Sequence, residues 1–224
     1  VKYEGNGTAG HAIPHHLSKA PEVVLVKNRE YNGTEWCMGT QTDTWMGNQN
    51  STKMDWSKVI YTDGNDYSAH NDNLFNSQSP TNTHFYVRNA ASVNHSGQSL
   101  IAYCWHSIPG YSQVGAYAGN GNSTRNAFVY TGFEPDVVFL TNMDSPSGRM
   151  IHNSVISKYN TEINQKGSSY WEWHSGQNVQ TGFGFDMKSN GFQIRNGNQS
   201  WGSTNHHYWY MAFAKNPFKY SNAR

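Results

Sequence analysis

The sequence predicts an all-β protein, and three observations lead to that prediction. Short runs of β-branched and aromatic residues alternate with Gly-Asn, Asn-Gly, Asp-Gly and Ser-Gly pairs, which mark turns. No dozen-residue window free of Gly and Asn shows the apolar spacing of an amphipathic helix. The chain also repeats itself. Together these features predict two tandem pseudo-repeats of about five or six strands each, with β-sandwich or jelly-roll-like packing.

Individual strands are indicated by their patterns. Val23–Val26 is continuously apolar, which is typical of a strand buried on both faces or in the core of a sandwich. Phe85–Asn89 and Phe192–Asn196 alternate apolar and polar residues, which favours half-buried strands. Leu100–Trp105 and Tyr208–Ala214 are longer aromatic runs, and the first is interpreted as a buried strand.

The repeat rests on four matches that occur in the same order in both halves. The matching pairs are Tyr3–Gly7 with Tyr117–Gly121, Ala20–Val26 with Glu134–Leu140, Phe85–Asn89 with Phe192–Asn196, and Ile101–Cys104 with Met211–Ala214. We therefore expect a unit of about 110 residues, with one repeat at 1–114, the second at 115–224 and the joint near Gly115. The two repeats could instead merge into one compact β domain. They differ most at 31–84 and 143–189, where a β scaffold usually carries variable loops.

Composition excludes several classes of protein. The formal net charge is +1, from 16 Lys and Arg and 15 Asp and Glu. A nucleic-acid-binding protein usually carries a clear excess of basic residues, which this chain does not have. Charged residues make up only 14% and aromatic residues also make up 14%, so the surface is expected to be polar but not ionic. A chain of 224 residues buries enough surface to fold without a metal or disulfide. No cofactor is expected.

The two cysteines, Cys37 and Cys104, have no metal-site spacing. Cys104 is expected to be a small core residue, and a bridge between the two stays open because sequence does not give the required geometry. The N-terminal residues show no signal-peptide features and no initiator Met, so we expect a fragment or the end of a longer chain.

The sharpest candidate binding feature is the aromatic cluster at 170–174. In an extended segment Trp171 and Trp173 point the same way, and with Tyr170 beside them they form a platform on which sugar rings could stack. The alternative is that both indoles pack in the core. Further ligand-binding candidates are Trp45 and Trp56, in a polar stretch that also holds Trp36, and Trp201, at an expected turn.

Metal and catalytic motifs give weaker signals. The histidines His11, His15, His16, His206 and His207 are interpreted as partly exposed polar residues, and no metal is expected. The segments 63–66 and 71–73 are interpreted as turns, with an irregular ion site left open. No nucleophile elbow, phosphate loop or zinc-protease motif occurs, and Glu172 is the only carboxylate among aromatic residues. We therefore expect a protein that is not an enzyme, with a glycan-cleaving enzyme as the alternative.

The chain resembles a known family in nearly its whole length. The resemblance is carried by Tyr3–His11 and Ala20–Asn28 at the opening of the first repeat, by Ala102–Tyr111 and Gly119–Gly121 at the joint, by Phe128–Pro135 in the second repeat, and most of all by Met211–Arg224. These segments are similar to an uncharacterised duplicated β domain at the C-terminal ends of tail and fibre proteins of bacteriophages, especially marine phages and cyanophages. The resemblance implies an extracellular location in the phage tail of the virion, a homotrimer, and contacts with other tail proteins.

Three functions follow as hypotheses. The first is a distal tail-fibre domain that binds the host receptor, either a surface glycan or an outer-membrane component. The second is a structural assembly module of the virion without receptor contact. The third is a glycan depolymerase. No nucleic-acid partner is expected.

Overall fold

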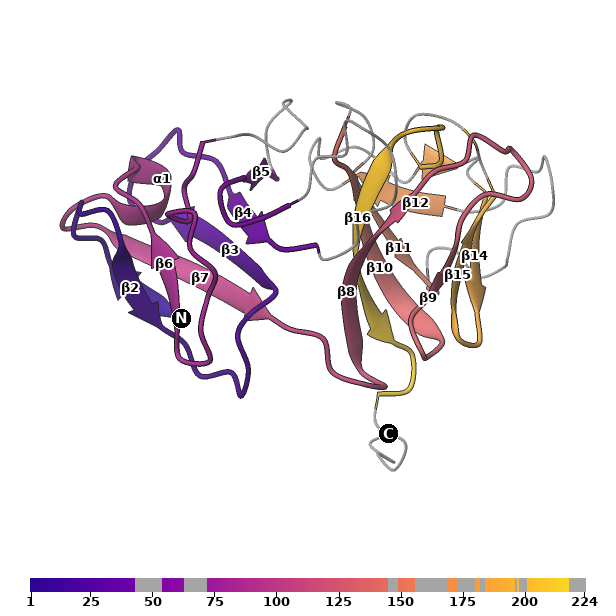
Figure 1. The fold of residues 1–224 in the computed structure, drawn as a ribbon, viewed down its shortest axis with the longest axis horizontal. Coiled ribbons are helices and arrows are strands. Elements are labelled where there is room, and N and C mark those ends of the chain that lie inside the picture. The colour runs from indigo at the N-terminus through magenta and orange to yellow at the C-terminus, as the bar shows by residue number, and fades with distance from the viewer. Residues whose placement is uncertain are drawn as a thin grey trace. The chain divides into compact units, whose positions relative to one another are not determined.

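A computed structural model describes residues 1–42, 54–62, 72–144, 149–155, 169–172, 180–181, 184–195, 197 and 201–217. These residues form two compact units that divide between His106 and Ser107. The sequence placed the joint near Gly115, but Gly115 lies in the middle of strand β8 (Ser112–Ala118), which belongs wholly to the second unit. The prediction of an all-β protein is confirmed (Figure 1). No helix in the described residues is long and apolar enough to cross a membrane.

Unit 1 is drawn from indigo to magenta in Figure 1 and contains two antiparallel sheets. The larger sheet has the order β1-β7-β3-β4-β5, and the smaller one pairs β2 with β6. A short helix, α1 (Ala91–Asn94), precedes β7. The strands are β1 (Lys2–Glu4), β2 (His11–Pro14), β3 (Val23–Asn28), β4 (Cys37–Thr40), β5 (Ile60–Tyr61), β6 (His84–Val87) and β7 (Ser99–Trp105).

Unit 2 also contains a larger and a smaller antiparallel sheet. The larger sheet has the order β13-β12-β11-β10-β16-β8, and the smaller one has the order β14-β15-β9. The strands other than β8 are β9 (Phe128–Tyr130), β10 (Pro135–Asn142), β11 (Arg149–Asn153), β12 (Ser169–Glu172), β13 (Gln180–Thr181), β14 (Phe185–Lys188), β15 (Gly191–Ile194) and β16 (His207–Ala214).

The two units share one strand order. Across the sheet, β1, β7, β3, β4 and β5 of unit 1 correspond in turn to β8, β16, β10, β11 and β12 of unit 2. Strand register refines one of the sequence matches. Tyr3 lies opposite Leu100, and Tyr117 lies opposite Tyr208, so Tyr208 is the counterpart of Leu100. The sequence match of these strands pointed two residues further on, to Tyr210. A shift of two residues keeps every side chain on the same face, which is why the pattern alone could not detect it.

The repeated Tyr-x-Gly-Asn-Gly motif makes the same contacts in both units. The Tyr3 hydroxyl donates to the carbonyl of Val93 (2.6 Å), and the Tyr117 hydroxyl donates to the carbonyl of Trp201 (2.9 Å). A Cβ atom on Gly5 would lie 2.1 Å from the carbonyl oxygen of His95, the residue that follows α1. A Cβ atom on Gly119 would lie 2.4 Å from the carbonyl oxygen of Ser203, which is the equivalent residue in unit 2. Glycine is therefore required at both positions because the backbones approach too closely for any side chain.

Each unit has its own hydrophobic core between its two sheets. The unit 1 core joins Val24 and Val26 of β3 to Phe85 of β6. The unit 2 core joins residues of β10 and β16 to Phe192 of β15. The same edge-to-face ring pair occurs in both, with centroids 6.1 Å apart between Tyr3 and Phe85 and 6.1 Å apart between Tyr117 and Phe192. The alternating residues of each strand supply these inward side chains.

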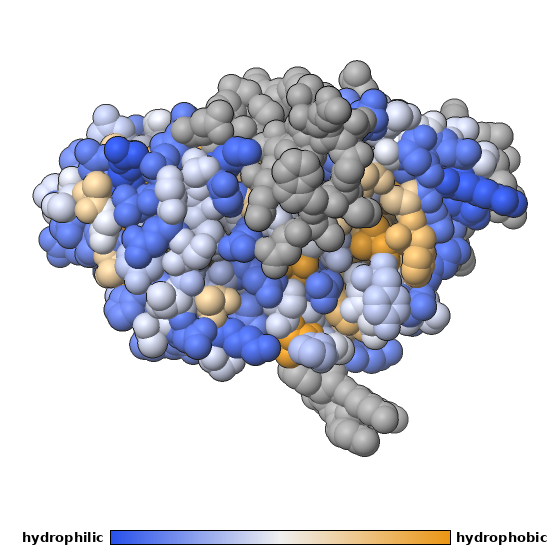
Figure 2. Space-filling model, viewed as in Figure 1, coloured by the Kyte–Doolittle hydropathy of each residue, from blue (hydrophilic) through white to orange (hydrophobic). Residues whose placement is uncertain are grey.

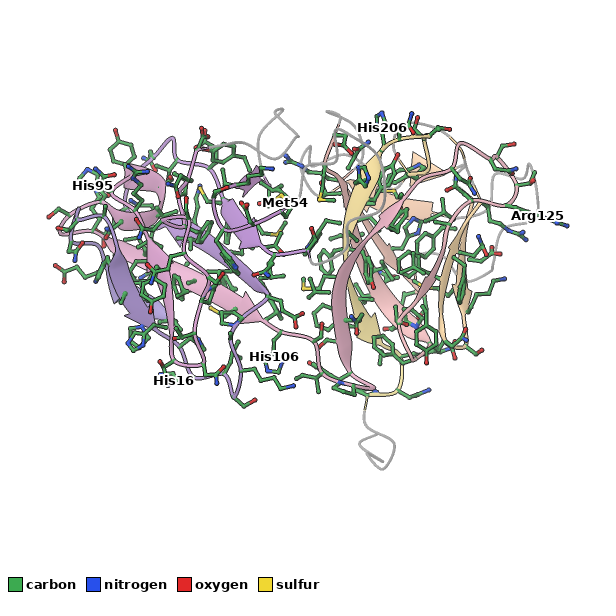
Figure 3. All side chains as sticks on the ribbon, viewed as in Figure 1. His16, Met54, His95, His106, Arg125 and His206 are labelled. Atoms are coloured by element: carbon green, nitrogen blue, oxygen red, sulfur yellow. The ribbon has the colours of Figure 1, made fainter. Side chains whose placement is uncertain are left out.

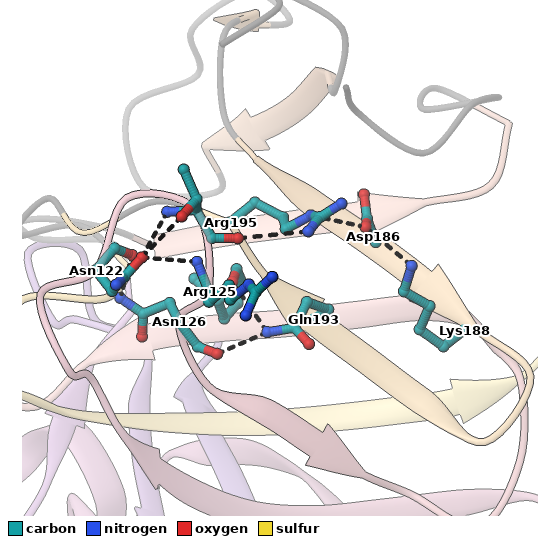
Figure 4. A network of polar contacts seen from close by, with 9 residues as sticks. Asn122, Arg125, Asn126, Asp186, Lys188, Gln193 and Arg195 are labelled. Atoms are coloured by element: carbon teal, nitrogen blue, oxygen red, sulfur yellow. Dashed lines mark hydrogen bonds and ion pairs between the residues drawn. The ribbon is translucent and has the colours of Figure 1, made fainter. Parts of the chain in front are cut away.

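A buried carboxylate fixes the β14–β15 hairpin of unit 2. Asp186 is almost completely buried, and its Oδ2 lies 3.0 Å from both Arg195 Nε and Lys188 Nζ (Figure 4). On the next strand, Gln193 Nε2 donates to the carbonyl of Asn126 (2.6 Å). Both cations remain partly exposed to water, whereas the Asp186 carboxylate is buried. The two cations therefore neutralise the buried negative charge of Asp186.

His152 makes unit 2 sensitive to acid. The ring is completely buried and stacks on Phe185 at a centroid distance of 4.0 Å, and burial lowers the pKa of His152 to about 3. In the unfolded chain the pKa returns to about 6.5, so the unfolded state binds a proton that the folded state excludes as pH falls below that value. We expect unit 2 to lose about 2 kcal/mol of stability between pH 7 and pH 5.

The measurement is urea denaturation at the two pH values for the wild type and for His152→Phe, which keeps a stacked ring but cannot titrate. The other histidines contribute equally to both proteins. An equal pH dependence in the two proteins would show that His152 is not the acid-sensitive group.

Candidate functional site

Two of the tryptophans that the sequence offered as ligand-binding residues are core residues. Trp56 is 3% exposed, packs edge-to-face on Phe75 and donates its Nε1 to Gln41 (3.2 Å). Trp201 is 2% exposed and takes the position that Val93 has in unit 1. Neither ring can receive a sugar, so the assignment of both to a binding surface is corrected. The physical reason is that each fills a gap between sheets that a local sequence pattern does not show.

The other candidates fall partly or wholly outside the described residues. The backbone of Tyr170 and Trp171 lies in β12, where Trp171 is opposite Ile151 of β11. The structure does not describe the side chains of this strand, nor does it describe Trp45 or Trp173. The platform of Trp171 and Trp173 stays a prediction.

An aromatic strip that the sequence reasoning missed lies on the outer face of the large sheet of unit 1. We define it as Trp36, Tyr103 and Trp105. Ring centroids are 6.2 Å apart between Trp36 and Tyr103, with planes at 29°, and 6.1 Å apart between Tyr103 and Trp105, with planes at 17°. Tyr103 is 43% exposed, and the two tryptophans are half-buried. The three rings thus form a nearly parallel row that reaches solvent.

Strand alternation positions this strip. Along β7, Leu100 and Ala102 point into the core, so Tyr103 and Trp105 point outward. Trp36 immediately precedes Cys37, which is a buried core residue of β4, and so takes the outer face as well. The period of two in β7 was the available signal. Interpretation of the whole run Leu100–Trp105 as buried is wrong for Tyr103, which is exposed, and for Trp105, which is half-buried.

The electrostatic surroundings of the strip are mild. The Lys27 ammonium lies 5.9 Å from the centroid of the Trp36 ring and donates a hydrogen bond to the carbonyl of Thr34. A cation over an indole is held by the negative face of the ring. Lys27 therefore braces Trp36 from one side. The strip is a surface of aromatic rings with one cation at its end.

Of the histidines that raised the possibility of a metal, His11, His15, His206 and His207 are engaged in hydrogen bonds. His15 lies with Nε2 3.0 Å from the carbonyl of Thr81, and its Nδ1 accepts from the amide of Leu17 (3.2 Å). His11 Nδ1 lies 3.0 Å from Asn94 Oδ1, and His207 Nδ1 lies 2.8 Å from Asp144 Oδ2. Segment 63–66 is outside the described residues. In the part of the chain that is described, no three such side chains gather as metal ligands.

The two cysteines lie on opposite neighbours of β3. Cys37 of β4 is opposite Val26, and Cys104 of β7 is opposite Val24, and neither forms a disulfide. Two strand spacings put them roughly 10 Å apart, which is too far for a disulfide. Burial raises the pKa of the Cys104 thiol to about 11.

We expect Cys104 to react about 100-fold more slowly at pH 8 in the folded protein than in urea, since the thiolate is the nucleophile and its fraction falls tenfold for each unit of pKa. A Cys37→Ala variant isolates this thiol in a colorimetric thiol assay. Equal rates in the folded and unfolded protein would contradict the burial of Cys104.

Fold and site together define a protein of two similar all-β units, with an exposed row of aromatic rings on one sheet. Residues 1–217 match the model of a family described as a domain of unknown function, DUF7483, and the chain belongs to that family. No curated protein and no solved structure matches the chain.

Proposed function

We propose that this protein is a carbohydrate-binding module and that the aromatic strip is the surface on which sugar rings stack. The observation that carries the proposal is the row of three nearly parallel, solvent-reaching rings Trp36, Tyr103 and Trp105. The C–H-rich faces of sugars pack on aromatic rings, while sugar hydroxyls stay hydrated or bond to polar neighbours. A linear row of rings suits successive residues of an oligosaccharide better than a single compact ligand.

Composition supports a ligand of low charge. The chain is nearly neutral, and the one cation at the strip is already bonded to a backbone carbonyl. Strongly anionic ligands need clusters of Arg and Lys, which the strip lacks among its described residues. The ligand class is therefore a neutral or weakly charged glycan, and the protein is proposed to bind it without cleaving it.

The setting is proposed from the resemblance to phage tail and fibre domains. In that setting the protein is the distal part of a tail fibre in an extracellular virion, assembled as a homotrimer, and the glycan lies on the host surface. Membership of a family of unknown function neither adds to this setting nor opposes it.

The binding test uses an array of bacterial capsular and lipopolysaccharide fragments together with neutral hexasaccharides of glucose and N-acetylglucosamine. Wild-type protein is compared with Trp36→Ala, Tyr103→Ala and Trp105→Ala. Each substitution is expected to weaken binding about tenfold, which corresponds to about 1.4 kcal/mol. Tyr31→Ala, which removes an exposed ring of unit 1 that lies outside the strip, is the matched control and should bind normally.

Binding that none of the three substitutions weakens would reject the strip as the site. Shortening of any polysaccharide during incubation would reject binding without cleavage, and Glu172→Gln would then test the alternative of a depolymerase.

One observation favours assembly as a second function. Strand β9 is an edge strand of its sheet, and Phe128 and Tyr130 on it are 47% and 67% exposed. Figure 2 shows hydrophobic side chains gathered over β9. Register gives Ala12 and Pro14 as their counterparts on β2 of unit 1. Proline protects an edge from pairing, whereas exposed aromatic residues on an unprotected edge favour contact with another chain.

The assembly function is tested by sedimentation of the wild type and of the Phe128→Ser, Tyr130→Ser double variant. A trimer that the double variant converts to monomer would support it. Identical oligomeric states of the two proteins would reject this edge as the contact.

A further inference from the structure

The chain contains Asn-Gly pairs that begin at Asn6, Asn32, Asn120, Asn190 and Asn196. In such a pair the backbone nitrogen of the glycine can attack the side-chain carbonyl carbon of the asparagine. Glycine permits this attack because it has no side chain to block the approach and adopts the backbone angles that the approach requires. Asn196 is outside the described residues, and the structure holds the other four pairs in different ways.

The first pair, Asn6–Gly7, is held by hydrogen bonds on both of its reacting groups. The Gly7 amide donates to the carbonyl of Asn94 (3.0 Å). Asn6 Oδ1 accepts from the amide of Thr8 (2.8 Å) and from Nδ2 of Asn94 (3.1 Å). Attack would require Gly7 to give up its bond and the Asn6 side chain to turn away from two donors, so the fold opposes the reaction here.

Two pairs in unit 2 are held in similar ways. The amide of Gly121 donates to the carbonyl of Gly202 (2.7 Å), so the glycine after Asn120 is held like Gly7 in the first copy of the motif. The carbonyl of Asn190 accepts from the amide of Thr131 (3.0 Å). That bond fixes the peptide plane between Asn190 and the glycine that follows it, and the fold therefore opposes the reaction at both pairs.

The pair Asn32–Gly33 is different, because neither residue makes a hydrogen bond within the part of the chain that the structure describes. Both residues are exposed, and a Cβ atom on Gly33 would meet nothing within 4 Å. Gly33 has a φ of +95°, as the third residue of a type II turn does. The peptide plane between the two residues is therefore able to rotate, since Gly33 takes up the change in φ while the flanking residues stay in place.

The residues that flank this pair connect it to the aromatic strip. Before the pair, the Tyr31 ring stacks on His95, which follows α1, at a centroid distance of 5.5 Å (Figure 3). After the pair, the carbonyl of Thr34 accepts the hydrogen bond from Lys27, the cation that braces Trp36. A change in the length or charge of the turn is thus close in the chain to the contact that positions Trp36.

We propose that Asn32 is a site of spontaneous deamidation in the folded protein and that the reaction loosens the brace on Trp36. The Gly33 nitrogen forms a bond to Cγ of Asn32 while the C–N bond of the side-chain amide breaks. Ammonia leaves with the proton of the Gly33 amide, and a cyclic imide remains. Water, the co-reactant, then opens the ring at either carbonyl, which gives aspartate or isoaspartate and restores the N–H of Gly33.

Both products alter the turn. Isoaspartate routes the backbone through its side chain and so adds one atom between Asn32 and Gly33. The Tyr31 amide donates to Asn28 Oδ1 (3.1 Å), which keeps the start of the turn in place, so the added atom displaces Thr34. The new carboxylate of either product also competes with the Thr34 carbonyl for the Lys27 ammonium, because a charged acceptor forms the stronger hydrogen bond.

The test incubates the 224-residue protein at mildly alkaline pH and locates deamidation by mass spectrometry of its peptides. Deamidation at Asn32 is expected to be about tenfold faster than at Asn6 or Asn120, because hydrogen bonds must break before either of those can react. A sample in urea is the control, and there the three sites should react at similar rates since no fold distinguishes them.

The link to Trp36 is measured separately, by the NMR signal of its indole N–H. This signal should shift in protein enriched in the isoaspartate form. Asn32→Gln is the matched variant, because its longer side chain closes a ring only slowly, and the same incubation should leave its Trp36 signal unmoved.

Equal rates at Asn32 and at Asn6 or Asn120 in the folded protein would overturn the proposed site. An unmodified Asn32 under conditions that modify the urea sample would overturn it as well. A Trp36 signal that stays in place in the isoaspartate form would overturn the effect on the brace. None of these measurements uses a glycan, so their outcome is independent of glycan binding by the strip.

Discussion

Replacing Phe192 with alanine is expected to destabilise unit 2 by about 4 kcal/mol, the largest effect of any single substitution considered for this protein. Phe192 is completely buried and contacts three other rings. It lies edge-to-face with Tyr117 at 6.1 Å and with Tyr210 at 5.3 Å, and it stacks on Phe185 at 5.2 Å. Truncation removes the packing of all three and leaves a cavity between the two sheets.

The measurement is urea denaturation followed by NMR methyl signals of Leu140 for unit 2 and of Val26 for unit 1. Phe192→Leu retains most of the volume and should cost less than half as much. The counterpart Phe85→Ala should act on unit 1. If the Phe192→Ala variant lost less than about 1 kcal/mol, the assignment of Phe192 to the centre of the unit 2 core would be wrong.

Gly5→Ala and Gly119→Ala are expected to destabilise units 1 and 2, respectively, by about 3 kcal/mol each. A Cβ atom at either position would fall within 2.4 Å of a backbone atom, and backbone cannot move aside as a flexible side chain can. The two effects should be similar because the two glycines make the same approach in the two units.

Gly33 and Gly110 are the matched controls. Each has a positive φ, +95° and +73°, but a Cβ atom there meets nothing within 4 Å. Their replacement by alanine should cost only about 1 kcal/mol, from backbone strain. Comparable losses at the control sites and at Gly5 and Gly119 would mean that steric approach is not what requires glycine in the motif.

The duplication of one β module stays a prediction of the sequence, and the two units share features that such a duplication would produce. The strand orders agree, and the Tyr3 and Tyr117 hydroxyls reach equivalent carbonyls in their own units. Similar losses of stability in the Gly5→Ala and Gly119→Ala variants would support this duplication.

The strands and the all-β class could be predicted because they depend on local alternation and turn residues. The boundary between the units could not, because a repeat match shows which residues are equivalent but not where a unit begins. The match placed the joint near Gly115, inside β8, and only the pairing of β8 with β16 reveals that the division comes earlier.

Site prediction was limited by tertiary burial. Trp56 lies among polar residues and Trp201 lies beside a glycine, and both sequence contexts favoured an exposed side chain. In the structure each side chain is buried in the core of its own unit. Trp36 and Tyr103 are 67 positions apart in sequence and meet only because β4 and β7 flank β3. Contact across a sheet between residues so distant is not visible to a pattern that spans a few neighbours.

The central claim is that glycan binds at the strip of unit 1, and the indole N–H signals of the eight tryptophans test it most directly. The experiment titrates ¹⁵N-labelled protein with an oligosaccharide identified on the array. We predict shifts of the Trp36 and Trp105 signals, with Trp56, Trp201 and Trp209 unmoved because all three are buried. Shifts confined to Trp45, Trp171 or Trp173, with Trp36 and Trp105 unchanged, would contradict the claim.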